Sequence, residues 1–560
     1  MYGFSIVGNG LLKGEICCDN FSIKNNFIDK FEGDKIFEEN DYYIVILDGV
    51  ILNKTEILKN SKSQKWSDAI ISLYEEKGET FFSVLRGSFA GAFYNKKRKK
   101  WTIFSDQLGT KFLYYCQSNQ FFCCSSVMGE MFSMLKSNNI KYNLDVIGAK
   151  MLLGYGFMLE NYTLCKEIKK IKPGCYIELE NNNIKEYQYY NLQNVKKNRI
   201  TEKEAIEGID CMFRQAVNLQ FKKDEEYGYM HLCALSAGLD CRMTSFVAHD
   251  LGYTNQTNIT FSQTNYYDDF VSKQMASDLR HEWVFKSLDD GNWLKDADEI
   301  NKITGGNVLY YGSSHGNSLL RLINFSKLGL LHSGQLGDVV VSTHAKNDND
   351  DFLFGDGAYS KSFIDDIRNE LKDSYLNQEM GLWYCRYLNG TNNGQQNEYN
   401  YTETLSPFLY LDFLEFALSI PASIRYDHQL YKKWIISRYP KAAAYIWTGM
   451  GDRIDAYSIK YKGVDYSLKV FIKKILKKTL NCNNSYWDSK FNMNPVGYYY
   501  STNEILKDYF SSYYCYEDLI EDNNLHMDVK RIIEKGNSIE QIQVHTLLSA
   551  LKLYFQNTNE

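Results

Sequence analysis

The sequence has 560 residues, which is more than one hydrophobic core usually serves, so two domains are expected. Hydrophobic residues make up 44% and charged residues 24% of the chain, a composition typical of globular proteins. The net charge of −6 argues against a nucleic-acid partner, and no apolar run approaches the ~18 residues that a membrane-spanning helix needs.

The cysteines and the first residues predict a cytoplasmic protein. The 13 cysteines form no C-x-x-C pair and show no cysteine–histidine spacing of a metal site, which favours reduced thiols. Met1-Tyr2-Gly3 begins a strand pattern rather than the charged and apolar regions of a signal peptide. We therefore expect a cytoplasmic location without membrane insertion.

Residues 1–193 alternate short apolar strands with turns. Helical patterns interrupt the strands at 66–76 and near 145–153. The strand patterns are YGFSIVGNG (2–10), YYIVILDGV (42–50), GSFAGAFYN (87–95), KWTIFSDQLG (100–109), KFLYYCQ (111–117), QFFCCSS (120–126) and CYIELENNNIKEYQYYNL (175–192). Runs of strands with few helices predict an α+β domain with antiparallel sheets.

A polar segment near 195–205 predicts a linker, and Thr201 with Glu204 matches a capping box before an amphipathic helix. Strands then alternate with helices, which predicts an α/β doubly wound parallel sheet with ligands beyond the carboxyl ends of its strands. The strand patterns cover 228–235, 257–263 and 329–333, and the helical patterns cover 241–250 and about 268–280. From about 360 the chain is mostly helical, with helices at 408–419, 428–439 and 539–556.

The segment SAGLDC, 236–241, lies between a predicted strand and a predicted helix. Gly238 lets the backbone approach an anion closely, and Ser236 and Cys241 add side-chain donors beside the first N–H groups of the helix. Asp240 suits a phosphate site only with a cation beside it, which predicts Mg²⁺. The alternative is an ordinary turn between a strand and a helix.

Two further strand ends have similar features. In LLHSGQLGDVV, 330–340, Ser333-Gly334 offers a second small-residue turn, and Asp338 offers a carboxylate that could share the metal with Asp240. Phe261-Ser262 ends the intervening strand, where a purine could lie. An ordinary turn remains the alternative for the second loop. Capping of the next helix is the simpler explanation for Asp268 and Asp269.

These segments carry a resemblance to a known family. SAGLDC resembles the S-G-G-x-D-S pyrophosphate loop of the N-type ATP pyrophosphatases. Together with five other segments, it resembles the asparagine synthetase (glutamine-hydrolysing) family. The other matching segments, in the family's order, are LDGVILNKTEI, LRGSFAGAFYNKKRKKWTIFSDQLGTKFLYY, IKPGCYIEL, SGQLGD and LSPFLYLDFLEFALSIP.

The resemblance implies two domains. Residues 1–193 would form a glutamine amidotransferase type 2-like domain with the αββα sandwich of N-terminal nucleophile hydrolases, and residues 200–560 an ATP pyrophosphatase domain with a helical C-terminal part. It also implies ATP and Mg²⁺ as cofactors, with Asp240 and Asp338 on the metal. The implied ATP-binding residues are Leu235, Ser236, Gly238, Asp240, Cys241, Phe261, Ser262, Ser333 and Gly334.

The sequence departs from the family in the first domain. Tyr2 stands where the family has its nucleophilic cysteine, and Asp48 where it has the oxyanion-stabilising Asn. A phenol does not replace a thiolate, and a carboxylate would repel a developing oxyanion. We therefore expect this domain to be an inactive scaffold.

The second domain departs as well. Gln335, Val339 and Leu405 replace two acids and an arginine of the family. The family's late lysine is absent from 445–455, where Arg453 is the candidate substitute. Cys241 is expected to act as a donor rather than a nucleophile, and His315 and His332 as packing or substrate-pocket residues.

Three functions follow from the resemblance. The first is an ATP-dependent ligase that adenylates a carboxylate and joins it to an amine or ammonia without glutaminase activity, as in β-lactam synthetases and lasso-peptide macrolactam synthetases. The second is a non-catalytic member that binds nucleotide or a partner. The third is a true asparagine synthetase or a sugar-acid amidating enzyme. The expected partners are small-molecule or peptide carboxylates and amines, and a homodimer is compatible with the sequence.

Overall fold

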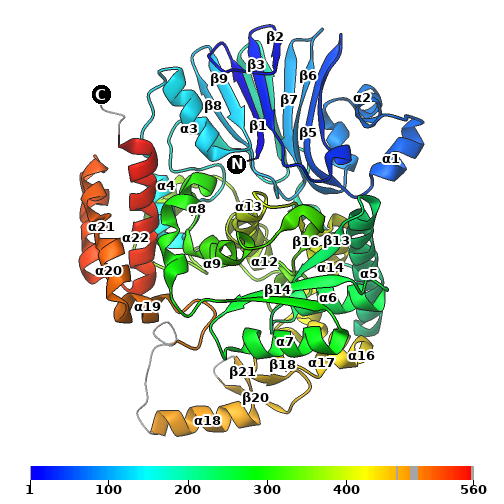
Figure 1. Cartoon of the computed structure of the whole chain (residues 1–560), viewed down its shortest axis with the longest axis vertical. Coiled ribbons are helices and arrows are strands. Elements are labelled where there is room, and N and C mark those ends of the chain that lie inside the picture. The colour runs from blue at the N-terminus through cyan, green and yellow to red at the C-terminus, as the bar shows by residue number, and fades with distance from the viewer. Residues whose placement is uncertain (1, 462–463, 480–489, 557–560) are drawn as a thin grey trace.

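The computed structural model describes residues 2–461, 464–479 and 490–556. The first part of the chain consists of two six-stranded antiparallel sheets that face each other (Figure 1). Their strand orders are β10-β8-β9-β1-β3-β2 and β12-β11-β7-β6-β5-β4. The strands are β1 (Gly3–Gly8), β2 (Ile16–Cys18), β3 (Phe21–Asn26), β4 (Ile36–Glu39), β5 (Tyr43–Ile51), β6 (Gly87–Asn95), β7 (Lys100–Ser105), β8 (Tyr114–Ser118), β9 (Phe121–Ser125), β10 (Lys169–Lys170), β11 (Cys175–Glu180) and β12 (Asn183–Gln188).

Strand β5 shows why helices cover both outer faces. Ile44 and Ile46 belong to the core between the sheets, whereas Val45 and Leu47 pack with residues of α2 on the other side. Successive side chains of a strand point to opposite faces, so a strand that is apolar at every position must be covered twice. The covering helices are α1 (Lys54–Ser61) and α2 (Trp66–Lys77) on one sheet and α3 (Met128–Ser137) and α4 (Val146–Tyr155) on the other. This is the αββα layering expected for the first domain.

The second part contains a five-stranded parallel sheet with the order β15-β14-β13-β16-β17. The chain runs outward from β13 to β15 and then returns to place β16 on the other side of β13. The direction of winding therefore reverses between β13 and β16, where open α/β sheets bind their ligands. The elements are α5 (Glu202–Glu226), β13 (Met230–Ala234), α6 (Asp240–Asp250), β14 (Gln256–Ser262), α7 (Tyr267–Leu279), β15 (Glu282–Ser287), β16 (Leu328–His332) and β17 (Thr404–Leu405).

The predicted elements of this part agree with the structure, with two omissions. Thr201 and Glu204 form the predicted capping box at the start of α5. Strands β15 and β17 were not predicted: four of the six β15 residues are only half-buried, and β17 has two residues.

The rest of the chain is mainly helical. The helices are α8 (Ala297–Thr304), α9 (Tyr311–Leu320), α10 (Gly337–Val340), α11 (Ile364–Glu370), α12 (Gln378–Leu382), α13 (Gln395–Glu398), α14 (Leu411–Ser419), α15 (Ala422–Arg425), α16 (Gln429–Arg438), α17 (Pro440–Ala443), α18 (Leu468–Thr479), α19 (Val496–Thr502), α20 (Glu504–Ser511), α21 (Asn523–Lys535) and α22 (Ser538–Ala550). Two short hairpins, β18 (Ile446–Trp447) with β19 (Asp452–Arg453) and β20 (Ser458–Tyr461) with β21 (Val464–Ser467), lie among them.

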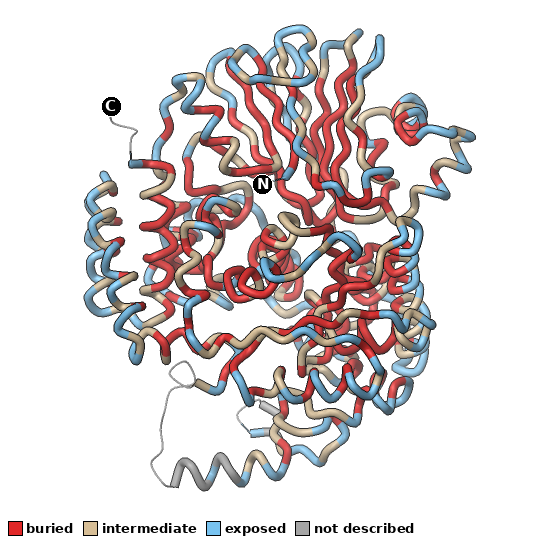
Figure 2. Tube along the Cα trace, in the orientation of Figure 1, coloured by how far each residue is buried: buried red, intermediate tan, exposed pale blue. Residues whose placement is uncertain are grey.

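The two parts share a core. Residues of α3 and α4 cluster with α21 and α22, so the end of the chain packs on its first third (Figure 2). Phe132 of α3 stacks on Tyr554 with ring centroids 4.1 Å apart, and the Tyr142 hydroxyl donates to the Tyr554 carbonyl at 2.7 Å. The predicted boundary near residues 193–200 therefore does not separate two independent cores.

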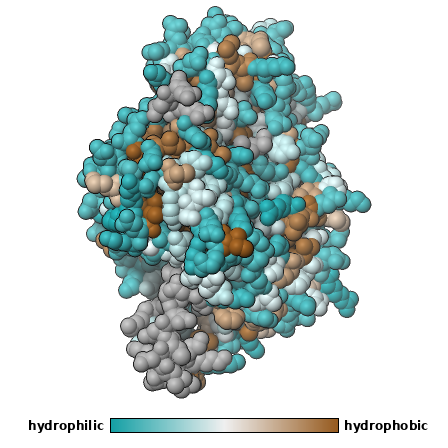
Figure 3. All heavy atoms as spheres, turned by 60° about the vertical axis from the view of Figure 1, so that its left-hand side comes forward, coloured by the Kyte–Doolittle hydropathy of each residue, from teal (hydrophilic) through white to brown (hydrophobic). Residues whose placement is uncertain are grey.

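The face that carries the C-terminal helices is largely hydrophilic, and its apolar residues lie in small separate groups (Figure 3). In the part of the chain that the structure describes, no helix combines the length and apolarity needed to cross a bilayer.

Candidate functional site

A cavity of about 530 Å³ opens at the carboxyl ends of β13, β14 and β16. Eight of the site residues predicted from the sequence line it: Ser236, Gly238, Asp240, Cys241, Phe261, Ser333, Gly334 and Asp338. They come from three strand ends on both sides of the point where the sheet reverses its winding. The tertiary structure therefore joins the two small-residue loops into one site.

Three predicted residues lie outside the lining. Leu235 is buried, and its carbonyl accepts a hydrogen bond from the Thr260 hydroxyl at 2.8 Å. Ser262 is also buried, and its hydroxyl donates to the carbonyl of Gln263. The Arg453 guanidinium pairs with Asp455 on the surface of β19.

The first loop is held by the neighbouring helix α7. The buried carboxylate of Asp268 accepts a hydrogen bond from the backbone N–H of Ala237 at 2.7 Å, and burial raises the pKa of Asp268 to about 6. Capping was the expected role of this acid, and that prediction is wrong, because the side chain points to the loop rather than to its own helix. The carboxylate of Asp269 instead accepts from the backbone N–H of Asn265.

A buried arginine fixes the same loop from the other side. Arg242 donates to the carbonyl of Ala237 at 2.9 Å and to the carbonyls of Ala442, Tyr445 and Ile446. Desolvation lowers the pKa of Arg242 to about 10. No local pattern predicts this role, because three of the four partners are backbone carbonyls some 200 positions away.

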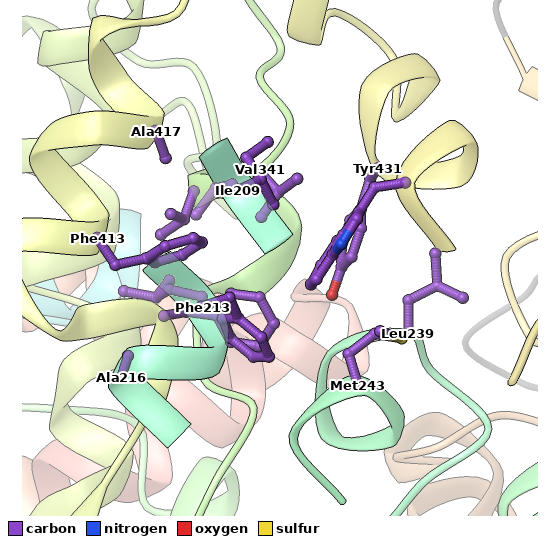
Figure 4. Packing of buried hydrophobic residues seen from close by; sticks show 14 of the residues in the cluster. Ile209, Phe213, Ala216, Leu239, Met243, Val341, Phe413, Ala417 and Tyr431 are labelled. Carbon is purple, nitrogen blue, oxygen red and sulfur yellow. The ribbon is translucent and has the colours of Figure 1, made fainter. Parts of the chain in front are cut away.

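Asp240 and Asp338 lie side by side in the site. The backbone N–H of Asp338 donates to the carboxylate of Asp240, and burial together with the charge of Asp338 raises the pKa of Asp240 well above its usual range. The Tyr431 hydroxyl donates to the same carboxylate at 3.0 Å, reaching from α16 to the start of α6 beside Leu239 and Met243 (Figure 4). Two adjacent carboxylates, Asp240 half-buried and Asp338 exposed to the cavity mouth, are a donor set that fits Mg²⁺.

The second loop passes extremely close to the first. A Cβ atom at Gly334 would lie 2.2 Å from the nitrogen of Cys241, and one at Gly337 would lie 2.8 Å from the carboxyl carbon of Asp240. Only glycine allows this approach, so these positions bring Asp338 to Asp240. Burial raises the pKa of Cys241 to about 12, which keeps it a neutral thiol and fits the predicted donor role.

His332 and His231 hold the strand that leads into the second loop through contacts with Asp224. His332 precedes Ser333, and its Nε2 lies 2.7 Å from the buried carboxylate of Asp224, which also contacts His231 at 2.9 Å. The His332 ring stacks on Phe221 with ring centroids 3.7 Å apart. These are hydrogen-bond distances, as the predicted packing role of His332 requires. His315 lines the cavity.

A small separate cavity between the two parts contains Tyr2 and Asp48 of the first part with Tyr399 and Asn400 of the second. No cysteine occurs among the described residues that line it. The carboxylate of Asp48 lies 3.1 Å from Lys111 and 3.6 Å from Lys35, and both lysines also pair with Glu403 of the second part. These four buried side chains form an ion network between the two parts, and the two lysines hold the pKa of Asp48 below its usual range.

Comparison with known proteins finds relatives of this chain among asparagine synthetases. Residues 27–190 match the model of a glutamine amidotransferase domain. Asparagine synthetase [glutamine-hydrolyzing] 1 of Bacillus subtilis is 22% identical over 276 residues, which are 48% of this chain and 42% of that protein. Two putative asparagine synthetases [glutamine-hydrolyzing] of Methanocaldococcus jannaschii are 25% and 22% identical, over 45% and 72% of this chain and 51% and 70% of theirs.

The chain is therefore similar to asparagine synthetases, and residues 27–190 are similar to a glutamine amidotransferase domain. The alignments span about half the length of the first two relatives. Among solved structures, a glutamine phosphoribosylpyrophosphate amidotransferase from B. subtilis matches with a TM-score of 0.25 and 9% identity, over 51% of this chain and 85% of that one, and a score this low supports no argument.

Proposed function

We propose that the chain is an ATP-dependent ligase that adenylates a carboxylate and joins it to an amine or ammonia, without glutaminase activity. The observation that carries this proposal is the meeting of Asp240 and Asp338 between two small-residue loops in one cavity. Such loops offer backbone N–H groups to phosphate oxygens. Two carboxylates between them suit a nucleotide that binds with its metal.

The cavity residues would have separate roles in the reaction. A carboxylate oxygen of the substrate attacks the α-phosphorus of ATP, and pyrophosphate leaves toward the loops at Ser236 and Ser333. An amine then attacks the acyl-adenylate, and AMP leaves. Asp240 and Asp338 would hold Mg²⁺, which offsets phosphate charge when bound. Arg386, an exposed cation in the cavity lining, is placed to attract the acidic substrate.

The ion network around Asp48 supports the loss of glutaminase activity. Lys35 and Lys111 form ion pairs with the carboxylate of Asp48. This residue stands where the family has its oxyanion-stabilising amide. An amide N–H would stabilise a developing oxyanion, whereas a paired carboxylate offers it no donor. The described lining of this cavity also lacks a thiol nucleophile.

Pyrophosphate release from ATP–Mg²⁺ tests the proposal. Purified protein is supplied with panels of carboxylates and amines, with ammonium chloride and glutamine as alternative nitrogen sources. We expect release with at least one carboxylate, retention of that activity with ammonium or an amine, and loss in Asp338→Asn. Glutamate formed from glutamine would contradict the absence of glutaminase activity.

A non-catalytic, nucleotide-binding role is the second candidate, because the structure does not bring Arg453 into the cavity. It predicts ATP–Mg²⁺ binding in equilibrium measurements without pyrophosphate release for any substrate pair. Binding that is lost in Asp338→Asn while turnover is absent in the wild type would favour this role.

A further inference from the structure

Helix α18 (Leu468–Thr479) combines positive charge with apolar residues. Five of its 12 residues are lysines and none is acidic, whereas the whole chain carries a net charge of −6. All the others except Thr479 are apolar. The helix lies at the end of the molecule opposite the two antiparallel sheets (Figure 1). A basic amphipathic helix is typical of segments that bind a membrane surface or an acidic partner.

One face of α18 exposes apolar side chains. Leu468, Ile472 and Ile475 are 46%, 49% and 48% exposed. Their spacing of four and then three residues places them on the same face of the helix. Exposed apolar residues on a soluble protein are normally scattered singly, so a row of three on one helix indicates a binding surface.

Other side chains of α18 hold the helix to the rest of the protein. The Phe471 ring contacts the Tyr461 ring of β20 with centroids 5.5 Å apart. Val470 faces the turn between β18 and β19, where a Cβ atom on Gly451 would lie 3.1 Å from the Val470 Cγ2 atom. These contacts fix the position of the helix while the apolar row remains in contact with solvent.

A lysine and a tyrosine accompany the apolar row in the described residues. Lys469 is exposed. Tyr457 is 77% exposed, and its carbonyl accepts a hydrogen bond from the backbone N–H of Leu468 at 3.2 Å, at the start of the helix. A tyrosine ring has an apolar body and a polar tip, which suits the boundary between hydrocarbon and water.

We propose that α18 docks the protein on an anionic lipid surface. Leu468, Ile472 and Ile475 enter the headgroup region, and the lysines of the helix attract the anionic headgroups. Lysines are flexible point charges, so they pair with mobile headgroups without a fixed geometry. The docking is peripheral, with the helix in the plane of the surface, and it does not depend on the proposed ligase chemistry.

Vesicle sedimentation tests the proposal. Full-length protein is mixed with vesicles of phosphatidylcholine alone or with about 30% phosphatidylglycerol, at about 0.1 M and about 0.5 M sodium chloride. We expect binding to the anionic vesicles at the lower salt, at least about tenfold weaker binding to the neutral vesicles, and a similar loss at the higher salt. Equal binding to both kinds of vesicle, or binding to neither, overturns the proposal.

Two variants test whether α18 is the surface that binds. Ile472→Glu should weaken binding to the anionic vesicles at least about tenfold, because it places a negative charge in the apolar row. Ile505→Glu is the matched control, since Ile505 is 66% exposed on α20 and the substitution adds the same charge. We expect it to bind like the wild type. Equal binding by the two variants would show that another surface is used, and circular dichroism checks that both are folded.

An acidic protein is the other class of partner for such a helix. Polyglutamate serves as the probe, and its binding is measured by fluorescence anisotropy with the same variants. Binding of polyglutamate through Ile472 and the lysines, without binding to anionic vesicles, would assign α18 to a protein partner and overturn the membrane proposal.

Discussion

The carboxylate of Asp268 accepts a hydrogen bond from the backbone N–H of Ala237 at 2.7 Å, across 31 positions of the sequence. Helix α7 thereby fixes the loop that follows β13 before any ligand binds. The same loop is tied on its other side through the Ala237 carbonyl to Arg242. A loop held at both its N–H and its carbonyl is preorganised, and preorganisation reduces the entropy lost on binding.

Removal of the Asp268 side chain should therefore weaken nucleotide binding. We expect Asp268→Ala to raise the dissociation constant of ATP–Mg²⁺ about tenfold, the cost of one hydrogen bond to a charged group. Asp268→Asn keeps an acceptor oxygen and should retain most of the affinity. Isothermal titration calorimetry on the three proteins checks this, and equal affinity of Asp268→Ala and wild type would show that the loop needs no such contact.

Asp268 should also make stability depend on pH. Its pKa is about 6 in the folded protein and about 3.9 in an unfolded chain, so the folded state binds more protons between these values. Stability from this group is therefore greatest below pH ~4 and falls by about 2–3 kcal/mol as the pH rises to ~6. Urea unfolding between pH 4 and 7 should show this fall in the wild type and a smaller one in Asp268→Asn.

Gly334 should tolerate no side chain. In Gly334→Ala the new Cβ would lie 2.2 Å from the Cys241 nitrogen. That nitrogen is a backbone atom, so the clash can be relieved only if the main chain moves. We expect the two loops to separate and carboxylate-dependent pyrophosphate release to fall at least about 100-fold, because misplaced groups lose their catalytic geometry. Gly312→Ala is the matched control, since Gly312 lines the same cavity and a Cβ there meets nothing within 4 Å. Similar losses in both variants would contradict the steric explanation.

Arg242 should be essential for stability. Arg242→Met removes the guanidinium donor from four backbone carbonyls, of which that of Ala237 keeps a 3.3 Å bond from the Thr448 N–H. We expect a loss of at least about 3 kcal/mol in the free energy of unfolding. Arg214→Met is the control: Arg214 pairs with Asp250 on the surface, and its loss should cost less than about 1 kcal/mol. Denaturant unfolding of both variants measures the difference.

The ion network between the two parts should be vulnerable to removal of one member. Lys111→Met leaves Asp48 and Glu403 facing each other with Lys35 alone, and we expect a loss of about 3–5 kcal/mol. Adding Glu403→Gln should restore part of that stability, because it removes one of the uncompensated charges. A double variant as unstable as the sum of the two single variants would show that the groups do not interact.

Much of this molecule could be predicted from local patterns. The apolar strand patterns predicted β1, β5 to β9, β11 and β12 of the first part but missed β2, β3, β4 and β10. Thr201 with Glu204 predicted the start of α5. The two small-residue loops were recognised from their spacing to Asp240 and Asp338, and the cavity contains both. Strand β17 was missed because two residues carry no periodic signal.

The sequence by itself determined the antiparallel sheets of the first part and the strand–loop–helix order of the second, because these depend on local periodicity. Only the tertiary structure decided that Asp268 holds Ala237, that Arg242 reaches three carbonyls some 200 positions away, and that Asn397 and Glu398 share a cavity with Asp240. Each of these relationships joins segments that no periodicity connects. The first two arise where α7 lies beside the loop after β13 and where α17 and β18 lie against α6.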